Sequence, residues 1–341
     1  MSDSLTRDEL FPPPPTCLYV EVTNRCNLKC VTCIRTFETR EEAKDLSFEE
    51  FRSVVDQLPS LERAVLHGIG EPLLNRELPR MIEHLKARDV YVLFNSNATL
   101  LTPDWQKLLI ETGLDEFRVS MDAATEEKYE EIRGMPMLGK LVANLTEFND
   151  LKKGLGLSRP KVSLWLVGLK ENLHEMPAFF ALADQVGADE VYLQRLVYAD
   201  NGPEGSMMHR GHSLHHEAPK GADEVLRVCE ELSREHRVTL KASGATNPKE
   251  SLSGERGPHP WQACRRPFTL MYMTSNGNIL PCCISPFAVS LHEYPEIILG
   301  NVREKSLEEI WHGQRYQDWR RKLLSPCPAT PCKGCGVEWS L

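Results

Sequence analysis

Short apolar segments alternate with longer amphipathic ones between residues 17 and 236 of this chain. The short segments are rich in β-branched and aromatic residues and predict six strands, at 17–22, 63–67, 90–94, 116–120, 162–167 and 190–196. In the longer segments apolar residues recur three and four positions apart, which predicts helices at 47–58, 76–88, 103–111, 138–153, 174–186 and 222–236. Ser47 and Glu50 have the spacing of a capping box, which favours a helix start there.

Strands that alternate with helices of this length predict a parallel sheet built from βαβ units. Six units are too few to close an eight-stranded barrel. We therefore expect an α/β fold of the partial (β/α)6 type, a curved and partly open TIM-like barrel. In barrel enzymes the chemistry lies at the C-terminal ends of the strands, so the segments that follow the six strands should carry the functional residues.

The alternating pattern ends near residue 242, and short strands, turns and cysteines begin at residue 261. A stretch rich in Gly, Pro and Ser separates the two regions. The chain is therefore expected to divide into a proline-rich lead-in (1–16), a barrel (17–242), a linker (243–260) and a small cysteine-rich α+β domain (261–341).

The composition, 41% hydrophobic and 26% charged, is that of a globular protein. A net charge of −9 argues against a nucleic-acid partner, because phosphate contacts require a surface of lysine and arginine. No apolar run reaches the roughly 18–20 residues that span a bilayer, and the first ten residues lack the apolar core of a signal peptide. A cytoplasmic protein without a membrane partner is expected. In such a protein the eleven cysteines are better explained as metal ligands than as disulfides.

Three of these cysteines, Cys26, Cys30 and Cys33, follow the first predicted strand within eight residues. A 4Fe–4S cluster is usually held by four thiolates, so three nearby cysteines leave one iron open to another ligand. Zinc is the alternative. Structural zinc sites usually pair two C-x2-C units, whereas this spacing is C-x3-C-x2-C, and a cluster with an open iron is favoured.

The stretch from Glu21 to Cys33 resembles the cluster-binding motif of the radical S-adenosylmethionine (SAM) superfamily, although Thr32 stands where the family usually has an aromatic residue. Further segments follow in the order of that family. They are 68–72 (Gly-Ile-Gly-Glu-Pro), similar to its Gly-Gly-Glu-Pro, 95–97 (Asn-Ser-Asn), similar to Thr-Asn-Gly, 120–122 (Ser-Met-Asp), similar to Ser-Leu-Asp, and 133–134 (Arg-Gly). Four such segments in order, each near a predicted strand end, strengthen the resemblance.

This resemblance implies a set of SAM-binding residues: Gly68, Gly70, Glu71, Asn97, Ser120, Asp122 and Arg133. Glu71 and its loop would contact the amino end of SAM, which a carboxylate complements, and the other positions would line the ribose and carboxylate sites. For Ser120 and Asn97 the alternative is capping of the following helix. The resemblance also implies cleavage of SAM to a 5′-deoxyadenosyl radical, with a flavodoxin- or ferredoxin-type reductant.

Six more cysteines lie from residue 264 onward, in a region that resembles the SPASM/Twitch extension of radical SAM enzymes. Two fully thiolate-ligated clusters would need eight cysteines and one needs four, so one auxiliary 4Fe–4S cluster is expected. Its predicted ligands are Cys264, Cys282, Cys332 and Cys335, with Cys283 and Cys327 as reserve ligands. Structural zinc on the same four thiolates is the alternative.

An auxiliary cluster beside the substrate can accept an electron from a substrate radical. The main hypothesis is therefore oxidation or rearrangement of a polar small molecule, sugar- or aminocyclitol-like, because the single-cluster spacing is similar to that of aminocyclitol dehydrogenases. The alternative is a maturase that modifies a ribosomally made precursor peptide, against which only 16 residues precede the first strand. An electron-carrying scaffold without catalysis is disfavoured by Glu71 and the three-cysteine loop. No catalytic base is identified.

Overall fold

The computed structural model of this chain describes residues 10–198, 202–214, 219–243, 248–249 and 258–332. Ten strands in these ranges form one sheet, in the order β10-β9-β8-β1-β2-β3-β4-β5-β6-β7. Strands β8 and β1 to β7 are parallel, and β9 and β10 pair antiparallel. The strands are β1 (Cys17–Val20), β2 (Arg63–Val65), β3 (Tyr91–Ser96), β4 (Glu116–Ser120), β5 (Lys161–Gly168), β6 (Glu190–Arg195), β7 (Thr239–Ala242), β8 (Leu270–Met273), β9 (Asn278–Leu280) and β10 (Gly300–Asn301).

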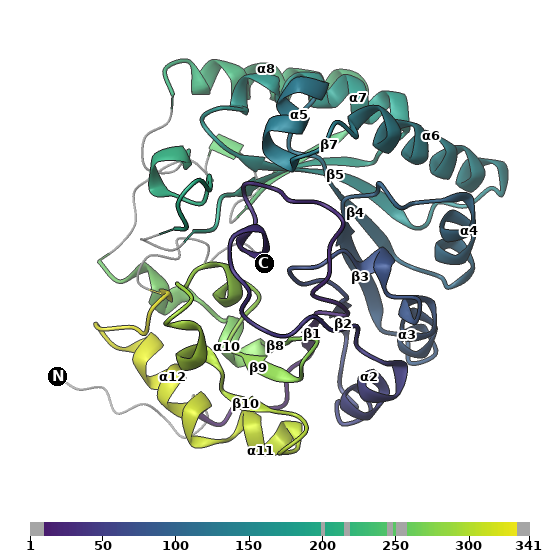
Figure 1. The fold of residues 1–341 in the computed structure, drawn as a ribbon. Helices are drawn as coiled ribbons and strands as arrows, with labels where there is room; N and C mark the ends of the chain where they lie inside the picture. Colours follow the sequence, from purple (N-terminus) through teal and green to yellow (C-terminus); the bar gives the residue numbers. More distant parts are fainter. Residues whose placement is uncertain (1–9, 199–201, 215–218, 244–247, 250–257, 333–341) are drawn as a thin grey trace.

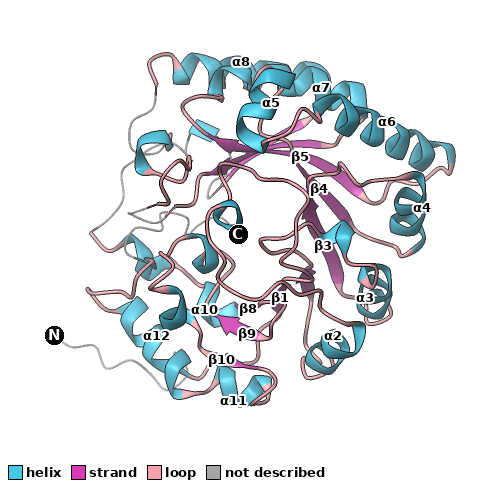
Figure 2. Cartoon of the chain, in the orientation of Figure 1, coloured by secondary structure: helices cyan, strands magenta, loops and turns pink. Residues whose placement is uncertain are grey.

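The helices of the barrel lie outside the curved sheet, and loops fill the space that the sheet partly encloses (Figures 1 and 2). They are α2 (Phe48–Val55), α3 (Leu78–Lys86), α4 (Pro103–Glu111), α5 (Glu126–Arg133), α6 (Leu138–Gly154), α7 (Ala178–Val186) and α8 (Ala222–His236). The C-terminal part contributes α10 (Arg266–Thr269), α11 (Leu307–Trp311) and α12 (Gln314–Leu324). None of the helices in the described ranges has the length and apolar character needed to cross a membrane.

The prediction of an α/β partial barrel is confirmed. Strand β4 and helices α4 and α8 begin and end at the predicted residues, and the capping box of Ser47 and Glu50 starts α2. The hydrophobic pattern does not predict β7, because only one of its four residues is buried and they present no apolar run. Pairing with β6 positions this strand, and such a tertiary contact leaves little trace in the local sequence.

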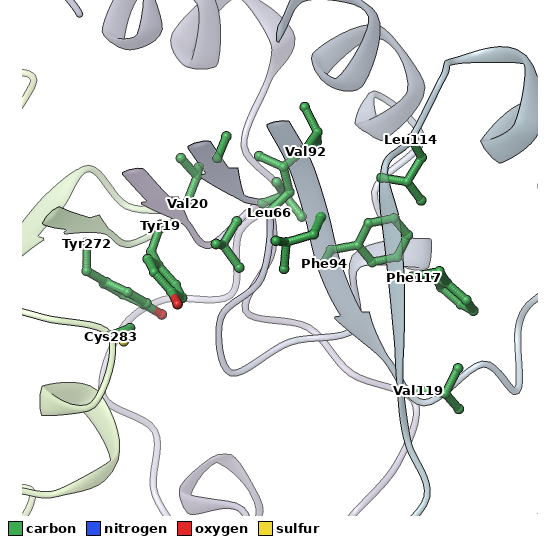
Figure 3. Packing of buried hydrophobic residues seen from close by; sticks show 14 of the residues in the cluster. Tyr19, Val20, Leu66, Val92, Phe94, Leu114, Phe117, Val119, Tyr272 and Cys283 are labelled. Carbon is green, nitrogen blue, oxygen red and sulfur yellow. The ribbon is translucent and has the colours of Figure 1, made fainter. Parts of the chain in front are cut away.

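The small C-terminal part continues the sheet of the barrel. Strand β8 pairs in parallel with β1, in a register that sets Cys17 opposite Leu270 and Val20 opposite Met273. Figure 3 shows Tyr19, Tyr272 and Cys283 close together where the two strands meet. The predicted division into a barrel and a cysteine-rich domain therefore runs through one continuous sheet.

Alternation along the strands separates the core from the pocket, because successive side chains of a strand point to opposite faces. Residues such as Val20, Val92 and Phe117 are fully buried in the hydrophobic core (Figure 3). Their neighbours Tyr19 and Arg118 line a pocket instead. One face of each strand thus stabilises the fold, and the other is left for chemistry.

The proline-rich lead-in packs against the C-terminal helices. The indole Nε1 of Trp311 donates to the carbonyls of Pro12 (3.2 Å) and Pro13 (3.0 Å), and Arg320 donates to the carbonyl of Leu10 (3.0 Å). Proline supplies no backbone N–H but keeps its carbonyl acceptor. The N-terminal segment thereby ties the two ends of the described chain together.

Candidate active site

One large pocket lies at the C-terminal ends of strands β1 to β6, as expected for a barrel enzyme. It contains about 1390 Å³ of space free of protein atoms, including its solvent-open mouth. The segments that follow the strands form one side, and the region around Cys283 and Phe287 closes it from the C-terminal part. All the SAM-contact residues predicted from sequence line this pocket: Gly68, Gly70, Glu71, Asn97, Ser120, Asp122 and Arg133.

Cys26, Cys30 and Cys33 also line this pocket. Their loop is organised by Arg35, whose guanidinium donates to the carbonyls of Asn24 (2.9 Å) and Cys26 (3.2 Å). A short turn follows, in which the backbone N–H of Cys33 donates to the carbonyl of Cys30 (3.2 Å). The loop therefore presents its three thiols to a single space.

The chemistry of these thiols fits a metal cluster. Burial raises the pKa of Cys33 to about 12 and also raises the pKa of Cys26. Without a cation nearby, both side chains would therefore remain protonated thiols. Thiolates are the ligands of iron–sulfur clusters. Among the described residues no three Cys, His, Asp or Glu side chains are grouped as a single metal ion requires. The C-x3-C-x2-C spacing remains the reason to favour an iron–sulfur cluster over the zinc alternative.

Gly68 and Gly70 are required because their segment packs closely against the segment after β1, which includes the loop with Cys26, Cys30 and Cys33 (the cluster loop). A Cβ atom on Gly68 would lie 2.3 Å from the Cγ of Glu21, and one on Gly70 would lie 2.2 Å from the backbone oxygen of Thr23 and 2.6 Å from that of Arg25. Real Cβ atoms essentially never make contacts below 3.0 Å. The glycines thus bring the segment after β2 against the segment after β1, a role that the resemblance to SAM-binding loops does not reveal.

Glu71 joins the ends of β2 and β3. Its carboxylate accepts hydrogen bonds from the N–H of Leu73 (3.1 Å), the hydroxyl of Ser96 (2.7 Å) and the N–H of Asn97 (2.8 Å). Burial raises the pKa of Glu71, and these three donors oppose that effect. The carboxylate therefore organises the pocket wall, and its predicted contact with the amino end of SAM stays a prediction.

Arg133 and Asp122 form a buried ion pair (2.7 Å) next to the cluster loop. The same guanidinium lies 3.7 Å from the Sγ of Cys30, within hydrogen-bond range of sulfur. The first carboxylate oxygen of Asp122 accepts from the N–H of Val167 (2.7 Å). The Arg-Gly and Ser-Met-Asp segments thus meet in space, and their predicted contacts with SAM are untested.

The capping alternative for Ser120 and Asn97 is wrong. The N-cap residues of α4 and α5 are Thr102 and Thr125, whose side chains accept from the N–H groups of the following turn. Asn97 donates instead from Nδ2 to the side-chain oxygen of Asn27 (2.9 Å). This bond links the end of β3 to the cluster motif.

Cys264, Cys282 and Cys332 line a second, smaller cavity in the C-terminal part. Cys283 lines the large pocket instead. This geometry favours Cys282 over its neighbour as an auxiliary ligand, and the thiol chemistry of the three residues fits an iron–sulfur cluster. Cys335 lies outside the described residues, and Cys327 is exposed. Arg266 and Ile284 line both cavities and stand between them.

Sequence patterns miss several residues of the pocket. His67 lines the pocket and belongs to no motif that identifies it. Arg35, which orders the loop of the three thiols without lining the pocket, belongs to none either. Arg118 has a detectable signal, because it stands two positions before Ser120 on the same strand and alternate residues of a strand share a face.

A partial barrel with three thiols lining its pocket and a second cavity lined by cysteines defines an iron–sulfur enzyme of the barrel type. Residues 20–183 match the family model of the radical SAM superfamily, and residues 264–336 match that of the SPASM iron–sulfur cluster-binding domain. The chain belongs to the radical SAM superfamily and carries a C-terminal SPASM domain. SAM and 4Fe–4S clusters are its cofactors.

Three characterised relatives align with nearly the whole chain. A tungsten-containing aldehyde ferredoxin oxidoreductase cofactor-modifying protein of Pyrococcus furiosus is 24% identical over 94% of this chain and 87% of its own length. An AdoMet-dependent heme synthase of Methanosarcina barkeri is 26% identical over 95% and 88%. A PqqA peptide cyclase of Granulibacter bethesdensis is 25% identical over 96% and 82%.

The fold is also similar to that of a solved structure. Streptococcus suis SuiB bound to precursor peptide SuiA superimposes with a TM-score of 0.70 at 15% sequence identity, covering 96% of this chain and 70% of that chain. This likeness supports the fold alone. It spans the barrel and the C-terminal part together.

Iron analysis of two adjacent cysteine variants tests the auxiliary site. Anaerobically reconstituted protein should hold about eight irons per chain, for two 4Fe–4S clusters. Cys282→Ala should lower this to about four, because Cys282 lines the cysteine cavity, and Cys283→Ala should leave it unchanged. About four irons together with zinc in the wild-type protein would contradict a second cluster. Iron loss in the Cys283 variant but not in the Cys282 variant would make Cys283 the ligand in place of Cys282.

Proposed function

We propose that this enzyme modifies a residue of a ribosomally made precursor peptide. The observation that carries the proposal is the similarity to a PqqA peptide cyclase over 96% of the chain, which includes both the barrel and the SPASM region. The expectation of a sugar- or aminocyclitol-like substrate has no comparable support among the relatives. The peptide hypothesis, the alternative at the level of sequence, is therefore preferred.

The residues of the chain prepare the pocket for this chemistry. When bound, SAM and its cluster supply the radical that removes a hydrogen atom from a substrate C–H bond. Arg35 and Glu71 hold the loops around the pocket in place, and Leu28 and Leu196 provide apolar lining. Preorganised loops of this kind keep reacting groups in register.

We further propose ligand sets from the pocket linings and from the spacing of the cysteines, with Cys335 included on spacing alone. Cys26, Cys30 and Cys33 would hold the SAM-binding cluster. Cys264, Cys282, Cys332 and Cys335 would hold the auxiliary cluster, which serves as an electron acceptor in an oxidative modification. A flavodoxin- or ferredoxin-type protein would supply the first electron. In this proposal the radical is formed in the barrel, and residues 261–341 hold the auxiliary cluster.

A substrate panel tests the peptide proposal. Reconstituted enzyme, SAM and dithionite are incubated with synthetic peptides encoded by short reading frames beside the gene, and mass spectrometry follows peptide mass and 5′-deoxyadenosine. A peptide mass change that accompanies 5′-deoxyadenosine formation and is absent in Cys30→Ala would support the proposal.

The same panel includes Fe-coproporphyrin III and an aminocyclitol, because two relatives of this chain, a heme synthase and an Fe-coproporphyrin III synthase, are named for porphyrin products. Consumption of either compound, with every peptide unchanged, would overturn the proposal.

A further inference from the structure

The wall of the pocket formed by β4, β5 and β6 carries a guanidinium held in one orientation. Arg118, on β4, donates from Nε (2.8 Å) and Nη2 (3.2 Å) to the carboxylate of Glu116. Its guanidinium carbon lies 4.5 Å above the ring of Trp165, which stacks on Tyr192 with centroids 3.8 Å apart and planes 12° apart. These contacts fix the side chain before any substrate binds.

One edge of this guanidinium remains available to the pocket. No hydrogen bond among the residues that the structure describes uses Nη1 of Arg118, although the side chain is only 14% exposed and lines the pocket. An arginine can donate five N–H bonds in a fixed plane. A ligand in the pocket would therefore meet preoriented donors on a rigid aromatic support.

The charges around the pocket favour an anion at this wall. Four arginines but only two acidic residues line it: Arg118, Arg133, Arg195 and Arg266 against Glu71 and Asp122. Of the two acidic residues, Asp122 is bound to Arg133 and Glu71 accepts three bonds from the chain. Both acidic residues of the lining are thus engaged by groups of the chain, while Arg133 is paired with Asp122 and Arg118 with Glu116.

Two further ionisable residues, His67 and Glu190, bear on the charge near Arg118. Burial and the charge of Arg118 lower the pKa of His67 to about 4, so this imidazole is neutral at physiological pH. Glu190, on β6, is bound by Lys161 (2.7 Å) and Lys241 (2.8 Å). Neither residue adds a negative charge beside Arg118, whose ion-pair partner is Glu116.

We propose that Arg118 binds a carboxylate of the substrate, on a platform formed by Trp165 and Tyr192. A carboxylate matches the planar donor edge of arginine in charge and geometry. In a peptide this group is an acidic side chain or the free C-terminus. This proposal rests on the proposed function only in one respect, namely that the molecule bearing the carboxylate is a peptide.

Three matched pentapeptides test this site by calorimetry on the reconstituted, SAM-bound enzyme. They are acetyl-Gly-Gly-Glu-Gly-Gly-amide, the same peptide with Gln for Glu, and the Gln peptide with a free C-terminal carboxylate. One of the acidic peptides should bind about tenfold more tightly than the neutral one. Which of the two acids is preferred identifies the source of the carboxylate.

Variants assign the preference to Arg118. Arg118→Gln should abolish it and Arg118→Lys should retain part of it. Arg227→Gln, which changes an exposed arginine paired with Glu224, should leave it intact. If Arg118→Gln does not fold because Glu116 is left unpaired, the Glu116→Gln/Arg118→Gln double variant removes both charges and serves as the test.

Other results would overturn the inference. The first is equal binding of all three peptides, and the second is a preference for the acidic peptide that survives in Arg118→Gln. The third is an Arg118 variant that weakens only SAM binding, which would assign this wall of the pocket to the carboxylate of SAM. Glutarate separates this inference from the peptide function. If glutarate binds through Arg118 and no peptide binds, the carboxylate site is supported and the peptide function is rejected. If peptides bind with no preference for an acidic group, the peptide function is supported and the carboxylate site is rejected.

Discussion

Replacing Cys30 by alanine should reduce 5′-deoxyadenosine formation from SAM to the background rate. Cys30 is buried, and its thiol lies 3.7 Å from the guanidinium of Arg133, between the other two thiols of the motif in sequence. Three thiolates must hold three irons for the fourth iron to stay open, so loss of one ligand removes the cluster or its geometry. Chromatography of the quenched reaction measures the product.

Two further cysteines serve as comparisons for this experiment. Cys229→Ala changes a buried cysteine of α8 that lines neither site, and should cleave SAM at the wild-type rate. Cys282→Ala, in the auxiliary cavity, should keep SAM cleavage within about twofold of wild type, as expected for an independent site, and should block product formation. SAM cleavage by the Cys30 variant would refute the assignment of the first cluster.

Gly70→Ala should have an effect of similar size without touching any ligand. The new methyl group would lie 2.2 Å from the backbone oxygen of Thr23 and 2.6 Å from that of Arg25. Backbone cannot turn aside as a side chain does, so the segment leading to Cys26 must shift. A misplacement of about 1 Å can cost on the order of 100-fold in rate, and SAM cleavage should fall by at least that much.

Gly154→Ala is the matched control for this prediction. Gly154 ends helix α6, and an added Cβ would meet nothing within 4 Å. Alanine is also the better helix former, so stability and SAM cleavage should be unchanged or slightly improved. Wild-type cleavage rates in Gly70→Ala would show that the close approach of the two loops is dispensable.

Glu71, Asn97 and Asp122 illustrate how far the sequence reaches. Each follows a strand that the hydrophobic pattern predicts, and parallel strands bring their C-terminal ends to one edge of the sheet. The three residues therefore had to line a common pocket, as they do. Their polar partners were beyond prediction, because Ser96, Asn27 and Arg133 come from different segments whose side-chain directions depend on packing.

Cys282 and Cys283 illustrate the opposite case. The two residues are adjacent and chemically identical, so spacing alone left both as candidates. Their side chains enter different cavities, a separation that depends on how the chain turns after β9. Only the packing of the C-terminal part against the barrel selects one of them.

The sequence by itself determined the cofactor chemistry, the order of the βα units and the loops that carry the cysteines. These properties are local: they depend on residue type, spacing along the chain and the period of apolar positions. Tertiary structure decided that β8 joins β1, that glycines press one loop against another, and that Arg118 stands on an aromatic platform facing the pocket. The physical reason is that packing and long-range strand pairing bring together residues whose separation along the chain carries no signal of their contact.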